Sequence, residues 1–179
     1  MGSRGGTYPT QLHDLRSLVA EYAIGTLGDT ETSWEEFLAV PASVLAPERT
    51  LLEKLALLHD GASRFPDDHA RSKLLQGGRH LYDVHQLLGS ESVLEALRTQ
   101  GPAGVQALWS DIDEHSQDAD FSFTPRPAAG FGASPLLDNN SPWQSVGRQG
   151  YVTAMDLVYG ERPSFDDCIK IIRAHASLL

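Results

Sequence analysis

Residues 48–60 read ERTLLEKLALLHD, and their apolar side chains recur every three or four positions. At about 100° per residue, five side chains of this stretch fall on one arc of about 120°, as in an amphipathic helix. The residues on that arc are Leu51, Leu52, Leu55, Leu58 and His59. The pattern predicts a helix from Pro47 to about Asp60, with Pro47 in its first turn and Gly61 at its end.

Helical patterns also fill most of the chain after this stretch. A polar loop is expected over residues 61–72, and a connector rich in Gly, Pro, Ser and Asn over 119–142. Ser90 and Ser164 are expected to cap two helices, and Gly101-Pro102 to separate two others. The expected helices cover residues 73–88, with Gly77-Gly78 near the start, and residues 90–100, 103–115, 142–159 and 164–178.

The chain before residue 47 has a different pattern. A helix is expected over residues 10–24 with Thr10 as its N-cap, followed by one or two short edge-type strands over 33–46, where Pro41 interrupts the run. The fold class is therefore α+β and predominantly α-helical. Residues 1–46 form one expected domain, and residues 47–179 form a C-terminal helical domain.

Composition and charge limit the classes of function. The 179 residues are 41% apolar and carry a net charge of −10, which argues against a protein that coats nucleic acid with a basic surface. No apolar run is long enough to cross a membrane, and MGSRGGTYPT has no signal-peptide core. Cys168 is the only cysteine, so no intrachain disulfide can form, and a cytoplasmic location is the default expectation.

Lys54 is a candidate binding residue in the first helix. Its position lies just off the apolar arc, so its stem is expected beside the core and its amine at the rim. A lysine held in this way can present a fixed positive charge to a phosphate. The alternative, which spacing alone favours, is a lysine that merely reaches past the core to solvent.

The stretch GGRHLYDVHQLL, residues 77–88, holds the other candidates. Leu81, Val84 and Leu88 define its expected buried face, with Arg79 and Asp83 on the opposite side. Those two residues are four apart and could simply form a surface ion pair. The functional alternative is a cleft in which Arg79 holds a phosphate and Asp83 places a cation or a reacting hydroxyl. His80 and His85 do not share a face, so no metal pair is expected of them.

Other polar or reactive groups are expected to be structural. The Asp111-Ile112-Asp113 and Asp118-Ala119-Asp120 sequences fall in a late helical region and are interpreted as a solvated acidic face, and Cys168 as a core residue. The Gly-rich turn in residues 3–6 matches no phosphate-loop spacing, and no zinc-type Cys/His spacing occurs.

Taken together, these motifs resemble the AbiEii/AbiGii nucleotidyltransferase toxins. Residues 48–60 and RHLYDVHQLL, residues 79–88, are similar to the two C-terminal motifs of that family, which read roughly ERTxxEKLxALH and RDLYDLxxL. The flanks also fit. MGSRGGTYP resembles the family's strand exit, and residues 151–179 resemble its closing helix pair.

The resemblance implies a DNA polymerase β-like core with a helical C-terminal region. It implies a toxin that transfers NMP from NTP to the 3′ acceptor end of tRNA, with Mg²⁺ as cofactor and a cognate antitoxin as partner. By family motif, Lys54 would bind the triphosphate and Asp83 would be essential to the same site. Arg79 matches a frequent basic position beside them.

One part of the family pattern is missing. The family's metal ligands lie on an Asp-x-Asp pair expected before MGSRGG, so no metal ligand is assignable in this chain. Residues 1–46 are then the remnant of a nucleotidyltransferase core that is truncated at its N-terminus. The alternative is a non-catalytic helical module that binds an antitoxin or a partner chain. Loss of the front half predicts exposed apolar surface near residues 33–46, and with it either self-association or a partner that supplies the missing strands.

Overall fold

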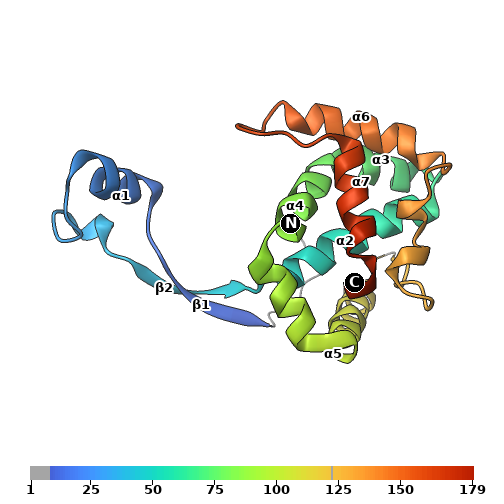
Figure 1. The fold of residues 1–179 in the computed structure, drawn as a ribbon, viewed down its shortest axis with the longest axis horizontal. Coiled ribbons are helices and arrows are strands. Elements are labelled where there is room, and N and C mark those ends of the chain that lie inside the picture. Colours follow the sequence, from blue (N-terminus) through green and yellow to red (C-terminus); the bar gives the residue numbers. More distant parts are fainter. Residues whose placement is uncertain (1–8, 122) are drawn as a thin grey trace. The chain divides into compact units, whose positions relative to one another are not determined.

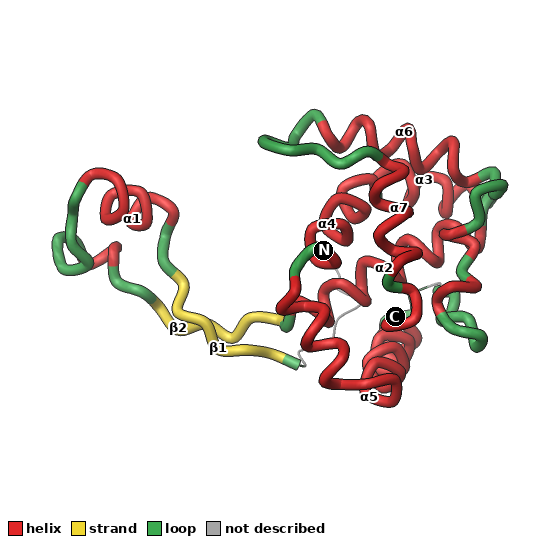
Figure 2. Tube along the Cα trace, viewed as in Figure 1, coloured by secondary structure: helices red, strands yellow, loops and turns green. Residues whose placement is uncertain are grey.

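The computed structural model describes residues 9–121 and 123–179, so the predicted Gly-rich turn in residues 3–6 lies outside the described residues. Helices dominate, and the described residues form one two-stranded sheet, which confirms a mainly helical α+β chain (Figures 1 and 2). The chain divides into two compact units with the boundary between Ala46 and Pro47. We call them the hairpin unit, which ends at Ala46, and the helical unit, Pro47–Leu179.

The hairpin unit is built on two antiparallel strands. β1 (Thr10–Leu15) pairs with β2 (Val40–Leu45) in a register that sets Thr10 opposite Leu45. The segment between the strands contains α1 (Leu18–Tyr22), a short π-helix at Ala23–Leu27 and a 3₁₀ helix at Glu35–Phe37. Its small core consists of Ala20, Ala23 and Phe37, with Ile24 packed against them.

The helix expected over residues 10–24 is wrong in its first half. Residues 10–15 form β1, Thr10 is a strand residue, and the helix is capped instead by Ser17, whose hydroxyl accepts from the Ala20 N–H at 3.1 Å. The leucines of this stretch do have helical spacing. However, β1 forms backbone hydrogen bonds with β2, at least 25 residues further along the chain, and this pairing overrides the local preference for a helix. The strand expected within residues 33–46 is confirmed as β2.

α2 (Pro47–Arg64) lies at the centre of the helical unit. Leu51, Leu52 and Leu55 on its predicted arc are fully buried, and the helix contacts α3 (Asp68–Gln76), α4 (Gly78–Leu88) and α5 (Glu91–Asp118) (Figure 1). The expected end at Asp60 is wrong. Gly61 is buried, and a Cβ there would lie 3.0 Å from the Leu74 side chain of α3, so this glycine allows close packing rather than ending the helix.

The expected loop over residues 61–72 is also mostly wrong. Asp67 caps α3 by accepting from the backbone N–H groups of His69 and Ala70, so helix resumes at Asp68. The helix expected over residues 73–88 is in fact two helices that part at Gly77. A Cβ on Gly78 would collide with the backbone of Gly150 in α6 (Trp143–Met155), and this explains the glycine at the start of α4.

The remaining elements agree more closely with the sequence. α5 is kinked at Gly101, which has φ +64°, where Gly101-Pro102 predicted a break. Ser164 caps α7 (Phe165–Ala174) in a capping box with Asp167. α6 ends at Met155 rather than Tyr159, and a 3₁₀ turn at Ala176–Leu178 follows α7. Cys168 is a core residue, as predicted, and burial raises the pKa of its thiol to about 11.

The connector over residues 119–142 packs against the helices. It contains 3₁₀ turns at Phe131–Ala133 and Pro135–Leu137, and the side chains of Phe131 and Leu136 are fully buried. The His59 side chain of α2 binds two points of this connector. The His59 Nδ1 lies 2.7 Å from Ser134 Oγ, and Nε2 lies 3.0 Å from the Pro125 carbonyl oxygen.

Among the residues that the structure describes, no helix combines the length and apolar character that crossing a lipid bilayer requires.

Candidate functional site

Lys54 and Asp83, predicted from separate motifs, are in direct contact. Lys54 Nζ donates to Asp83 Oδ2 at 2.7 Å, which joins α2 to α4. The two side chains are 21% and 24% exposed, so the pair lies at the rim of the core with one side open to water. The carboxylate therefore fixes the position of the ammonium group at a place that a ligand can reach.

This contact differs from the surface pair that spacing suggested. Asp83 is bonded to Lys54, and the structure gives Arg79 no ion pair with any residue it describes. Arg79 is exposed one turn before Asp83 on α4, and its guanidinium group remains available to an anion. Leu81, Val84 and Leu88 form the buried face of α4, as predicted.

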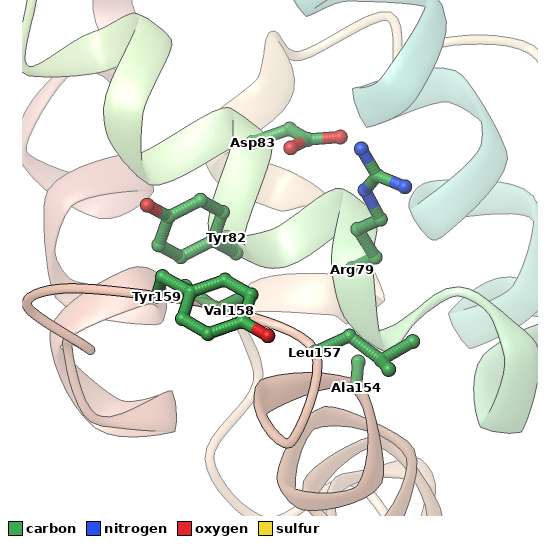
Figure 3. A pocket seen from close by; sticks show the side chains of 7 residues that line it. All are labelled: Arg79, Tyr82, Asp83, Ala154, Leu157, Val158 and Tyr159. Carbon is green, nitrogen blue, oxygen red and sulfur yellow. The ribbon is translucent and has the colours of Figure 1, made fainter.

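A pocket of about 270 Å³ opens beside these residues. α4 contributes Arg79, Tyr82 and Asp83, and the other wall comes from the end of α6 and the segment after it, including Leu157 and Tyr159. Figure 3 shows the Arg79 and Asp83 side chains extending to the same side, with the Tyr82 and Tyr159 rings bordering the same space. The sequence gives no sign of this second wall, because residues 154–159 fit only the pattern of a helix end.

His80 lies next to this group, and the pKa of its imidazole is lowered from the ordinary value. Burial lowers the pKa of its imidazole, and the positive charges of Lys54 and Arg79 lower it further, against the opposing effect of Asp83. His80 also borders an apolar pocket of about 420 Å³, which Leu57, Leu58 and Leu74 help to line. The sequence placed His80 beside the site but gave no sign of that pocket.

The sequence of this chain matches the sequence model of the family described as nucleotidyl transferase AbiEii toxin, Type IV TA system, over residues 1–170. This chain belongs to that family. No curated protein and no solved structure shows significant similarity to the chain. The resemblance carried by the two motifs is thereby confirmed, and the AbiEii family brings with it nucleotidyltransferase chemistry and an antitoxin partner.

The divalent metal expected for an AbiEii enzyme does not fit the residues described. Within residues 9–121 and 123–179, no cluster of three or more His, Cys, Asp or Glu side chains could hold a metal ion. The Asp111 of the late Asp-x-Asp sequence forms an ion pair with Arg49, whose side chain is fully buried. Asp118 and Asp120 are exposed, as expected of a solvated acidic face, and Asp111, whose side chain is 39% exposed, also serves as the partner of a core arginine.

Proposed function

We propose that this chain supplies the phosphate-binding half of a toxin that transfers NMP from NTP to the 3′ acceptor end of tRNA. The observation that carries the proposal is the Lys54–Asp83 ion pair, which unites the two family motifs at one solvent-accessible point. Arg79 adds a second cation on the neighbouring turn of α4.

Nucleotidyl transfer does not require any of these residues to form a covalent bond with the substrate. A hydroxyl oxygen of the tRNA end bonds to the α-phosphorus, the bond from that phosphorus to the bridging oxygen breaks, pyrophosphate leaves, and the hydroxyl proton passes to solvent. Negative charge accumulates on the departing pyrophosphate, and fixed cations lower the barrier by stabilising that charge. Lys54, held by Asp83, and Arg79 are suited to this role.

The family pattern places the metal-binding Asp-x-Asp pair before MGSRGG, so the proposal gives no metal ligand to the described residues. Mg²⁺ in such enzymes neutralises phosphate charge and aligns the reacting oxygens. Lys54, Arg79 and Asp83 would act on the triphosphate side and would not form the metal site.

Labelling of tRNA tests the proposal. Purified chain, and the same chain extended by whatever in-frame sequence its genome encodes upstream, are each incubated with labelled NTPs, Mg²⁺ and total tRNA. We expect 3′-end labelling of tRNA in at least one arm. In that arm, Lys54→Ala and Asp83→Ala should each lower the labelling rate by about 100-fold or more. Lys170→Ala and Asp118→Asn, which alter exposed residues, serve as matched controls and should label normally. No labelling in either arm overturns the proposal.

The alternative is a non-catalytic helical module that engages an antitoxin or a partner chain, and the antitoxin partner that the Type IV family implies is the observation in its favour. Co-expression with the product of the adjacent gene, combined with the labelling assay, distinguishes this binding module from an active transferase. A stable complex, together with no labelling in either arm, would support the binding module.

A further inference from the structure

The pocket beside Arg79 has features that the phosphate-binding role does not use. Tyr159 is 97% exposed and Leu157 is 83% exposed, although both line the pocket. Large apolar side chains left in water at a concave site mark a surface that a ligand covers. The segment that carries them leaves α6 at Met155 and turns at Gly160, which has φ +91°.

Two charged side chains line the pocket, the cation Arg79 and the carboxylate Asp83. Lys54 lies outside the lining and neutralises the Asp83 carboxylate through their ion pair. Asp83 is already satisfied by Lys54 at 2.7 Å, which leaves the guanidinium group of Arg79 as the unpaired charge on this wall. An anionic group is therefore favoured at the Arg79 end.

Two aromatic rings line the other part of the pocket. Tyr82 comes from α4 and Tyr159 from the segment after α6, with Val158 beside Tyr159, whereas Leu157 lies near Ala154 on the Arg79 side (Figure 3). A planar, uncharged ring is the group that such walls accept, since stacking needs only a π-face. The volume of about 270 Å³ is at the small end for a ligand pocket, so it holds one such unit and not several.

We infer that this pocket binds a single nucleotide, with its base against Tyr159 and its phosphate at Arg79. The inference rests on the proposed function for the class of substrate, and it deepens that function by naming the residues that hold the base. The nucleotide can come from the incoming NTP or from the end of the RNA strand, because both present a base and a phosphate.

Equilibrium binding to the purified chain tests the inference without requiring catalysis. The probes are four nucleoside monophosphates, the matching nucleosides, and single-stranded RNA trinucleotides. Tyr159→Ala should weaken binding of nucleosides and nucleotides alike by about tenfold or more, and Tyr159→Phe should retain it. Arg79→Ala should weaken nucleotides but leave nucleosides unchanged. Tyr22→Ala and Arg71→Ala alter exposed residues elsewhere and are the matched controls.

The two sources separate in the same experiment. Tighter binding of monophosphates than of trinucleotides assigns the pocket to the NTP, and the reverse assigns it to the RNA end. No measurable binding of any probe, or binding that is unchanged in both Tyr159→Ala and Arg79→Ala, overturns the inference.

Failure of the proposed function gives a different result. Binding with the expected variant pattern but no tRNA labelling would reject transfer and keep the nucleotide pocket. Labelling by Tyr159→Ala with unchanged KM for both NTP and tRNA would keep transfer and reject the pocket.

Discussion

The Lys54–Asp83 pair is only partly buried, and this decides what it can contribute. Exposed ion pairs contribute about 0–1 kcal/mol, because water screens them and two long side chains must be ordered. At 21% and 24% exposure, the pair is too open to be a main source of stability. Its better-supported effect is orientation, since the carboxylate fixes where the ammonium group lies.

A double-mutant cycle on Lys54→Met and Asp83→Asn should give a coupling energy of roughly 1 kcal/mol by urea unfolding. The exposed Arg98–Glu91 pair, whose side chains are 43% and 77% exposed, is the control and should couple more weakly. A coupling of about 3 kcal/mol or more would show that the Lys54–Asp83 pair is chiefly structural.

His59 gives a prediction about pH. Burial lowers the pKa of its imidazole below the ordinary value of 6.5, so the unfolded chain binds a proton at a higher pH than the folded chain does. Stability is therefore lost as the pH falls below about 6.5, because protonation favours the unfolded state. His59→Gln should flatten the fall in Tm between about pH 7.5 and about pH 5.

Only part of the slope should disappear in that variant, since the lowered pKa of His80 acts with the same sign. His69→Gln changes an exposed histidine and should leave the profile as it is in the wild type. If His59→Gln and wild type lose Tm in parallel, His59 does not couple protonation to folding.

At the scale of elements, two glycines allow α6 to pack closely, Gly78 against α4 and Gly150 against α3. Gly78 faces the Gly150 backbone, and a Cβ on Gly150 would lie 2.6 Å from the Leu75 carbonyl oxygen of α3. Neither glycine has a positive φ, so the requirement is for space and not for an unusual backbone conformation. This packing holds the α6 end of the candidate pocket near α4.

Gly78→Ala and Gly150→Ala should each destabilise the protein by about 1–3 kcal/mol, because an added methyl group meets backbone that cannot move aside. Gly132→Ala is the control, since its Cβ would meet only the Ala176 side chain at 3.8 Å. Thermal unfolding of the three variants checks this, and a neutral Gly78→Ala would contradict the close-packing explanation.

The elements also show where sequence reasoning fails. β1 was expected as a helix, because Leu12, Leu15 and Leu18 are spaced for one, yet all three are exposed and gain nothing from a helical face. The first part of α3, residues 68–72, was expected as a loop, because Ala70 is the one buried residue among polar ones there. In both cases the packing partner, β2 or α6, is distant in the sequence.

At the scale of the whole molecule, exposed apolar side chains are concentrated in the hairpin unit. Leu18 is 82% exposed, Leu12 76% and Val19 72%, and Trp34 and Val40 are also largely exposed. The sheet described there has two strands, so the outer edges of both strands lack a partner within that sheet. Apolar surface and open strand edges together favour association with another chain.

We predict that the purified chain self-associates as its concentration rises, as measured by light scattering. Leu12→Lys with Leu18→Lys should reduce the association without altering the helical unit, whose far-UV signal and Tm serve as the control. A monomer at every concentration would contradict the prediction.

The sequence by itself determined the helical class and the family, and it supplied the candidate residues of the site. Local periodicity predicts α2 and the buried face of α4. The two short family motifs contain Lys54, Arg79 and Asp83. The tertiary structure decided which of these residues meet. Asp83 bonds to Lys54 and not to Arg79, and Tyr159 shares a pocket with both α4 residues. Such contacts depend on how helices pack across many intervening residues, and local periodicity does not encode that arrangement.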